Sequence, residues 1–153
     1  MIYGDSLSNR SDPYDLNRFI NAQEGVYDRA LAELRSGLKR SHWMWYIFPQ
    51  IDGLGHSPTT RLYSIKSLEE ARQYLAHPVL GARLVECAEA VMAVQGQSAS
   101  DIFGHPDDWK LQSSMTLFEF VAGPGSVFEH VLDKYYGGKR DSRTLQIVGK
   151  RSG

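Results

Sequence analysis

The sequence predicts a mainly α-helical protein, a single globular domain of five or six helices with at most a small β element. Three observations lead to this fold class. Apolar residues recur at the helical period over several segments of the 153-residue chain. Ser67 and Ser126 each precede a glutamate by three residues, which is the spacing of a capping box at the start of a helix. No alternation of strand and helix patterns supports a parallel sheet with crossover helices.

The first part of the chain is predicted to form one long helix followed by irregular structure. Apolar residues at helical spacing cover about residues 15–36, and Gly37 is suited to end this helix. Residues 43–48 are predicted to be extended or irregular, because Pro49 disfavours a helical conformation at the residue before it. Residues 61–65 alternate between polar and apolar and predict a short strand.

The middle of the chain is predicted to hold two helices. Ser67 begins a short helix that ends at about Leu75, and a longer helix covers about residues 79–94. Residues 96–100 are polar, small or glycine, and we expect a flexible linker there.

Two further helices are predicted near the C-terminus. Pro106 stands at a first-turn position and begins a helix that reaches about Val121. Ser126 begins the next helix, which ends at the glycine pair of residues 137–138, and Asp141 is suited to cap one last turn. Five residues of the predicted helices are expected to share one core: Leu31, Leu34, Leu84, Val91 and Leu132.

Length and composition predict the domain organisation. The length fits one domain, which we expect to consist of a flexible leader at 1–13, a helical domain at 14–148 and a tail at 149–153. Hydrophobic residues make up 42% and charged residues 23% of the chain, as in ordinary globular proteins.

Charge and hydropathy argue against several classes of partner. A formal net charge of -1 gives no electrostatic basis for binding nucleic acid. No apolar run approaches the roughly 20 residues of a membrane span, and the N-terminus lacks an apolar signal core. The single cysteine, Cys87, excludes an internal disulfide and fits a reducing compartment, so we expect a cytoplasmic protein. The oligomeric state is left open.

The most unusual segment of the chain is Ser41–Gln50. It contains two of the three tryptophans together with His42 and a terminal glutamine. Tryptophan combines a large apolar face with one N–H group that needs a partner when buried. Its use beside histidine and glutamine indicates a concave site with a few polar groups. The alternative interpretation is an aromatic segment of the core.

A second unusual segment lies in the predicted helix after Pro106. Lys110 is followed by three hydroxyl side chains, Ser113, Ser114 and Thr116, although hydroxyls are unfavourable inside a helix. A helix that accepts this cost can present hydrogen-bond donors to a ligand. Small serines that permit close helix packing are the alternative.

Other motifs carry weaker signals. Asp141 follows a glycine pair and either caps a helix or presents a carboxylate to a ligand. The segment 53–55 predicts a turn and is no phosphate loop, because the later glycine of that motif is missing. The five histidines show no metal-ligand spacing, and Cys87 lies on an apolar helix face. We therefore expect no metal and no cofactor.

The motifs together resemble the bacterial family known as domain of unknown function 1810, which is sometimes mislabelled calpastatin. The resemblance covers about residues 14–148 and implies a mainly α-helical single domain without an established activity. Its motifs are Phe19-x-x-Ala22-Gln23, Lys39-x-x-His42-Trp43-Met44-Trp45-Tyr46-Ile47-Phe48-Pro49-Gln50, Gly53-Leu54-Gly55-x-Ser57, His77-Pro78-x-Leu80-Gly81, Asp108-x-Lys110-Leu111-x-Ser113-Ser114-Met115-Thr116-Leu117-Phe118 and Asp141-x-x-Thr144-Leu145.

A fainter similarity is to the NADAR family of N-glycosidases, which act on riboflavin-pathway intermediates and ADP-ribose adducts. It rests on the Ala-Gln pair of an early helix, an Asp-Trp pair followed by Met on a later helix, and a Gly-rich loop. The chain departs from that family at Asn17 and Glu24, where the family has glutamate and lysine. If the chain is an enzyme, this similarity implies an N-glycosidase-like hydrolase.

These observations predict one small-molecule pocket, formed where the Trp-rich segment meets the 110–116 helix. The ligand is expected to be anionic or nucleotide-like, and the activity to be hydrolysis or transfer on a nucleotide or ADP-ribose-like molecule. A non-catalytic interaction or ligand-sensing module is the alternative. The acid–base candidates are His42 and Asp108. The expected ligand-binding residues are Lys39, Trp43, Trp45, Gln50, Ser57, Lys110, Ser113, Ser114, Thr116 and Asp141.

Overall fold

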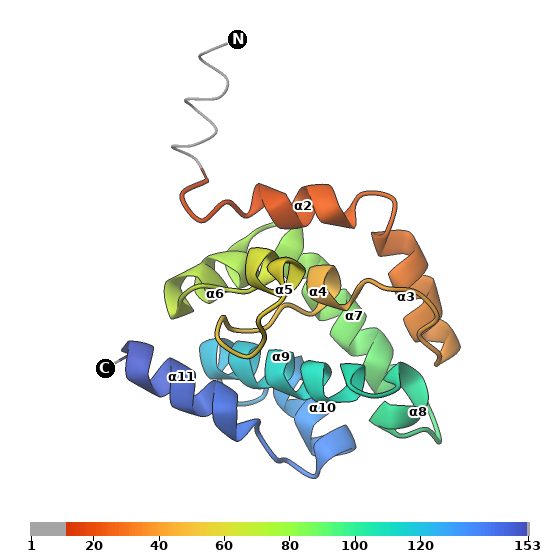
Figure 1. Ribbon diagram of the computed structural model, residues 1–153. Helices are drawn as coiled ribbons and strands as arrows, with labels where there is room; N and C mark the ends of the chain where they lie inside the picture. The colour runs from red at the N-terminus through yellow and green to blue at the C-terminus, as the bar shows by residue number, and fades with distance from the viewer. Residues whose placement is uncertain (1–11, 153) are drawn as a thin grey trace.

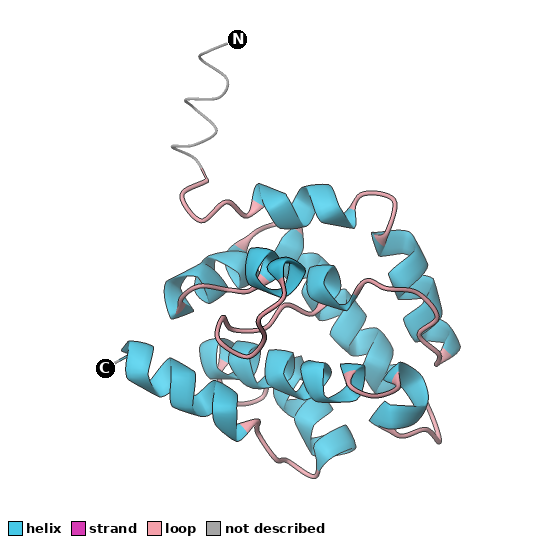
Figure 2. Ribbon diagram, viewed as in Figure 1, coloured by secondary structure: helices cyan, strands magenta, loops and turns pink. Residues whose placement is uncertain are grey.

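Ten α-helices and no strand make up the regular structure of residues 12–152, the part of the chain that the computed structural model describes (Figures 1 and 2). The mainly helical class is therefore confirmed, whereas the predicted number of five or six helices was too low. The predicted leader at 1–13 lies outside the described residues except for its last two. The helices are α2 (Asn17–Gln23), α3 (Tyr27–Ser36), α4 (Met44–Ile47), α5 (Pro58–Tyr63), α6 (Leu68–Ala76), α7 (Leu80–Ala93), α8 (Ala99–Phe103), α9 (Asp107–Ala122), α10 (Val127–Tyr136) and α11 (Ser142–Ser152).

The predicted helix at 15–36 is in fact two helices, α2 and α3. Gly25 has a φ of 72°, a left-handed conformation that suits glycine and that breaks the helical path. Apolar residues on both sides keep the helical period, so the sequence pattern alone did not show the break. Gly37 ends α3 as predicted, with its N–H donating to the carbonyl oxygens of Glu33 and Leu34.

Two of the expectations for residues 43–65 were wrong. The segment predicted to be extended contains the single turn of α4, and only its two ends, Trp43 and the Phe48 next to the proline, lie outside the helical conformation. The predicted strand at 61–65 is largely the end of α5, which the Ser57 hydroxyl caps by accepting from the Thr60 N–H. The sole β contact in the described part of the chain is an isolated parallel bridge between Ile51 and Ile65.

The later helices agree better with the predictions. Ser67 caps α6 and Ser126 caps α10, each by accepting from the N–H of the glutamate three residues on. The predicted linker at 96–100 instead starts α8, because Ser98 and Asp101 form a reciprocal capping box. After Asp141 the chain forms the eleven residues of α11, which reach into the predicted tail.

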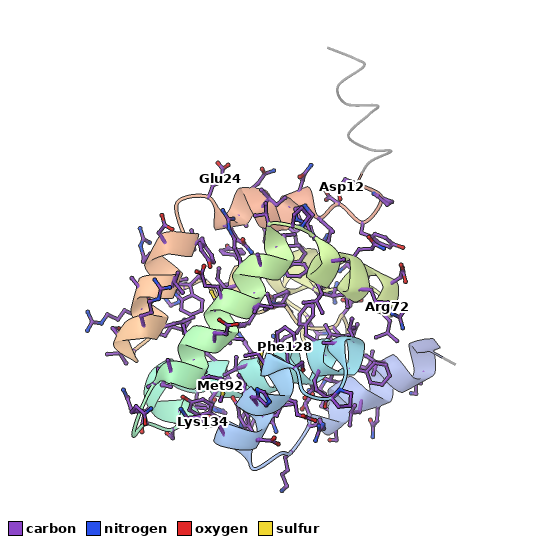
Figure 3. All side chains as sticks on the ribbon, turned by 180° about the vertical axis from the view of Figure 1, so that it is seen from behind. Asp12, Glu24, Arg72, Met92, Phe128 and Lys134 are labelled. Carbon is purple, nitrogen blue, oxygen red and sulfur yellow. The ribbon has the colours of Figure 1, made fainter. Side chains whose placement is uncertain are left out.

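The core lies between α7 and the helices around it. Helix α7 packs against α3, α6 and α10, and α9 packs against α6, α8, α10 and α11. Figure 3 shows Lys134 of α10 beside Met92 at the end of α7, where its ammonium lies 2.7 Å from the Met92 carbonyl oxygen. The five predicted core residues are all buried, which confirms that prediction: Leu31, Leu34, Leu84, Val91 and Leu132.

The N-terminal helix is joined to the rest of the domain by a buried ion pair. The Arg18 guanidinium lies 2.7 Å from the carboxylate of Glu70 at the start of α6. It also donates to the carbonyl oxygens of Leu62 and Ser64, at 2.8 and 2.9 Å. Arg18 of α2 therefore holds the end of α5 next to the start of α6. By length and hydropathy, no helix within residues 12–152 qualifies as a membrane span.

Gly81 provides a test of the α6–α7 packing. A Cβ atom at this position would lie 2.0 Å from the carbonyl oxygen of Leu75, a distance that real atoms do not adopt. We predict that Gly81→Ala lowers the free energy of unfolding by about 1–3 kcal/mol, the usual cost of overpacking. This is opposite in sign to the gain of up to about 1 kcal/mol that alanine normally gives over glycine in a helix.

Urea denaturation of the two variants Gly81→Ala and Gly149→Ala measures the difference. Gly149 also lies in a helix, α11, and a Cβ atom there meets nothing within 4 Å. The Gly149→Ala variant is therefore expected to be as stable as the wild type or more stable. The same change in unfolding free energy for both variants would show that the close approach at Gly81 does not constrain the fold.

Candidate functional site

A cavity of about 440 Å³, the main cavity, lies between the Trp-rich segment, the loop before α5, and helices α5, α9 and α11. Figure 1 shows these segments, which are distant in sequence, close together on one side of the molecule. The volume lies in the usual range for small-molecule sites. The lining residues are Trp45, Gln50, Ile51, Leu54, Gly55, Thr60, Tyr63, Ser64, Pro106, Trp109, Lys110, Gln112, Ser113, Asp141, Ser142 and Arg143.

The predicted meeting of the Trp-rich segment with the 110–116 helix is confirmed. Trp45 and Gln50 line the main cavity from one side, and Lys110 and Ser113 line it from α9. The single turn of α4 brings Trp45 to the cavity. Ser113 faces it with a hydroxyl that donates to the Trp109 carbonyl oxygen at 3.2 Å.

Trp45 and Lys110 form the central contact of the main cavity. The Lys110 ammonium lies 5.2 Å from the centre of the Trp45 ring, a cation–π arrangement. The same ammonium is 3.7 Å from the carboxylate of Asp107, the first residue of α9. The Nε1–H of Trp45 is shielded from solvent and has no hydrogen-bond partner among the described residues. A buried donor of this kind carries a desolvation cost of about 1–3 kcal/mol.

Asp141 lies on the wall of the main cavity and also begins α11. Its carboxylate accepts from the N–H and the hydroxyl of Thr144, at 2.9 and 2.6 Å, so the helix-capping role is confirmed. The Asp141 N–H donates to the Thr116 hydroxyl at 2.9 Å, and that hydroxyl donates to the Gln112 carbonyl oxygen. Buried Thr116 therefore joins α11 to α9 and is not among the residues that line the cavity.

A second cavity of about 390 Å³, the side cavity, adjoins the main one and shares Trp45, Pro106 and Lys110 with it. His42 and Lys39 line it. The Lys39 ammonium is 2.8 Å from the other oxygen of Asp107 and 5.1 Å from the centre of the Trp43 ring. Lys110 and Trp45 therefore border both cavities.

Five of the expected site residues line neither cavity: Thr116, described above, and four others. Trp43 is fully buried, and its indole N–H donates to Glu33 at 2.9 Å, so this tryptophan belongs to the core. Ser114 is also fully buried, in agreement with the close-packing interpretation. Ser57 is exposed and caps α5. The carboxylate of Asp108 accepts from the backbone N–H of Trp109 and lies 3.0 Å from the ring nitrogen of His105.

Several residues that line the main cavity were not predicted from the sequence, and Tyr63, Trp109 and Arg143 are the aromatic and charged ones among them. Trp109 is 63% exposed and its ring contacts that of His105 edge to face at 4.2 Å. Arg143 stands two residues after Asp141, at the start of a helix that the sequence suggested would be a single turn. Tyr63 was missed because its segment was predicted to be a strand.

A further missed residue, Glu33 of α3, positions the start of the Trp-rich segment. Its carboxylate accepts from the backbone N–H groups of Arg40 and Ser41, at 2.7 and 3.1 Å, and from the Ser41 hydroxyl at 2.7 Å. It also accepts from the indole of Trp43. Burial alone would raise its pKa, but the hydrogen bonds from Arg40, Ser41 and Trp43 outweigh burial and lower the pKa of Glu33 to about 2.

No group of three or more metal-ligating side chains occurs within the described residues 12–152. Burial raises the pKa of the Cys87 thiol to about 12, which keeps it protonated and unreactive at neutral pH. The chemistry of the site therefore falls to the aromatic rings, amides, hydroxyls and charged groups of the two cavities.

Comparison with known proteins agrees with the sequence resemblance. The family described as "Protein of unknown function (DUF1810)" matches residues 13–148. Among solved structures, the chain is similar to the conserved hypothetical protein Rv1873 from Mycobacterium tuberculosis, with 53% identity and a TM-score of 0.89. The similarity covers 90% of this chain and 99% of that one. No curated protein matches the chain, and none of these comparisons supports the fainter similarity to the NADAR family.

The hydrogen bonds of Glu33 predict a dependence of stability on pH. Because the pKa of Glu33 is lower in the folded state than the value of about 4.3 expected in the unfolded chain, its contribution is present above that value. The contribution is lost as the pH falls toward 2. We predict that Glu33→Gln lowers the free energy of unfolding at pH 7 by about 1.5–3 kcal/mol, the range for a hydrogen bond to a charged group.

Urea denaturation between pH 7 and pH 2 measures the free energy of unfolding of the wild type and of Glu33→Gln. The difference between the two free energies is expected to shrink as the pH falls. Glu89→Gln removes an exposed glutamate of α7 and is the control for losing one charge. A wild-type-to-Glu33→Gln difference that stays constant over the whole pH range would contradict the assigned role.

Proposed function

The chain belongs to the DUF1810 family of proteins of unknown function, and we propose that it binds a small anionic molecule with a planar ring in the main cavity. The ligand class is a nucleotide or an ADP-ribose-like molecule. The observation that carries the proposal is the stacking of Lys110 against Trp45 on the cavity wall. This arrangement combines a surface for a planar ring with a charge for an anionic group.

Other lining residues support the same ligand. Tyr63 and Trp109 add two aromatic rings, and Arg143 adds a guanidinium that can bind a phosphate through two parallel hydrogen bonds. The Gln50 amide offers donors and an acceptor. Such a mixture of aromatic surface and a few polar groups is typical of small-molecule sites.

The concave shape favours a small ligand over a protein partner. An interaction module would present its tryptophans as an exposed patch. Here Trp43 is buried in the core and Trp45 lines a cavity. Only Trp109 is largely exposed, at the edge of the same cavity. We therefore place the interaction module second to a ligand-binding domain.

Hydrolysis or group transfer on the bound molecule is the enzymatic form of the proposal. Asp141 is the one acidic residue among the described residues that line the main cavity, so acid–base catalysis there would fall to it. Its two hydrogen bonds to Thr144 hold the carboxylate as a helix cap. His42 borders only the side cavity, and Asp108 borders neither. The geometry thus favours binding without turnover, as in a ligand sensor.

The compartment follows from the cysteine content. Cys87 is the single cysteine of the chain, and it is buried in α7 without a disulfide partner. This usage suits a reducing environment, where nucleotides are also abundant. We propose a cytoplasmic location.

Lys110→Met tests the proposed binding mode. The methionine keeps an unbranched stem against Trp45 but removes the charge, so the fold is expected to remain stable. We predict that calorimetric titration with AMP shows binding to the wild type and at least about tenfold weaker binding to Lys110→Met, because an ion pair to the phosphate is lost.

The control is Lys150→Met, which removes an exposed lysine of α11 that does not line either cavity. It should bind AMP as the wild type does. Thermal denaturation of all three proteins shows whether the fold is intact. The proposal is wrong if millimolar nucleotides give no heat with the folded wild type, or if Lys110→Met binds with unchanged affinity.

A further inference from the structure

We propose that the side cavity is an anion subsite for the same ligand, so that the natural ligand carries a diphosphate rather than a single phosphate. This inference rests on the proposed function, since it assumes a planar ring in the main cavity. The ligand class it names is a nucleoside diphosphate, or a larger molecule built on one. The argument depends on the continuity of the two cavities, on the charges around the side cavity and on the rigidity of its backbone.

The two cavities are adjacent and share the wall residues Trp45, Pro106 and Lys110. Lys110 reaches both of them, with its ammonium over the ring of Trp45 and near the carboxylate of Asp107. A molecule whose ring lies in the main cavity can therefore extend past Lys110 into the side cavity. The first anionic group would meet Lys110, and the next would enter the side cavity.

The charges around the side cavity are predominantly positive. Lys39, Arg40 and Lys110 line it together with a single carboxylate, that of Asp107. Both ammonium groups share that carboxylate, at 2.8 Å from Lys39 and 3.7 Å from Lys110. The Lys39 side chain is only 7% exposed, so water compensates its charge poorly. The carboxylates of Glu33 and Asp108 contact the lining residues Ser41 and His105 but do not themselves line the cavity, so the charged groups that a phosphate would meet there are mainly cations.

Two histidines add further donors to the side cavity. His42 and His105 both line it, and both are exposed; His105 stands two residues before α9. The His105 ring nitrogen is 3.0 Å from the carboxylate of Asp108. Imidazole N–H groups next to guanidinium and ammonium groups form a common environment for phosphate oxygens.

The backbone of this subsite is held in place without a ligand. The N–H groups of Arg40 and Ser41 donate to Glu33, and the N–H of Lys39 donates to the Ile102 carbonyl oxygen at 2.8 Å. Segments fixed in this way lose little entropy when a ligand binds. Since Glu33 is not among the residues that line the side cavity, its charge does not occupy the subsite.

Recognition in the side cavity would come from side chains rather than from the start of α9. The N–H groups of Asp108, Trp109 and Lys110 already donate to the carbonyl oxygens of Gly104 and Pro106. The subsite is therefore defined by removable side chains, and substitution can test it directly.

The experiment compares adenosine, AMP, ADP and pyrophosphate by calorimetric titration of the full chain. We expect ADP to bind the wild type at least about tenfold more tightly than AMP, because its second phosphate reaches the side cavity. In the double variant Arg40→Ala/His42→Ala, ADP is expected to bind only as tightly as AMP, while AMP itself is unchanged. Both substituted residues are exposed, so the fold should persist.

The matched control is Arg72→Ala/His130→Ala, which removes the same residue types from exposed positions that line neither cavity. It should keep the wild-type preference for ADP. Equal affinities of the wild type for AMP and ADP, or a preference that survives in Arg40→Ala/His42→Ala, would overturn the subsite and leave the proposed function standing.

The pyrophosphate titration separates the two proposals further. Pyrophosphate that binds the wild type but not Arg40→Ala/His42→Ala, in a protein that binds no nucleotide, would support the subsite and overturn the proposed function. No binding of any of the four molecules would overturn both.

Discussion

The arrangement of both cavities depends on one carboxylate, that of Glu33. The chain from Gly37 to Trp43 forms no helix and connects α3 to α4, so no regular helical hydrogen bonds fix its course. Instead, the Glu33 carboxylate accepts four hydrogen bonds from residues 40–43. Because the Trp43 indole is anchored to Glu33 and packs against Phe103, the following turn begins at a fixed place. That turn brings Trp45 to the boundary between the two cavities. One ionised side chain in α3 thus helps to decide where the cavity-lining Trp45 lies.

The opposite wall depends on side-chain contacts between helices, since the described residues form no sheet that could align them. The Thr116 hydroxyl of α9 binds the backbone at Asp141, and Arg140 pairs with Glu119 of α9 at 2.5 Å. These contacts fix the start of α11 against α9, and with it the positions of Asp141 and Arg143. The hydroxyls that are costly inside a helix therefore have separate uses: Thr116 positions α11, Ser114 packs in the core, and only Ser113 borders the main cavity. The hydroxyl pattern of α9, which suggested one ligand-binding face, therefore serves mainly the packing and positioning of helices.

What the sequence predicted correctly was local. Helix caps at Ser67 and Ser126, the end of α3 at Gly37 and the buried leucines follow from interactions within a few residues, so pattern reasoning found them. The short helices were missed because α4, α5 and α8 have four to six residues, and such helices are stabilised by tertiary contacts rather than by periodicity. Nor could the sequence separate Trp43 from Trp45, because the difference comes from Glu33, ten residues before Trp43. Nor could the sequence show that Asp107 rather than Asp108 borders the side cavity, because only the fold places Lys39, distant in sequence, beside Asp107.

Lys110 is the residue on which the proposed ligand binding mainly rests. An ammonium shared between an indole face and the 3.7 Å carboxylate of Asp107, which Lys39 holds more closely, gains little from either partner. A stabilising arrangement would pair each cation with its own carboxylate and give the Trp45 N–H an acceptor. Instead, the ammonium groups of Lys39 and Lys110 share the carboxylate of Asp107, and the buried N–H of Trp45 has no acceptor among the described residues. The proposed anionic ligand would add a second partner for Lys110 on the wall that the two cavities share. The proposal therefore rests on the arrangement of these groups together rather than on any single residue.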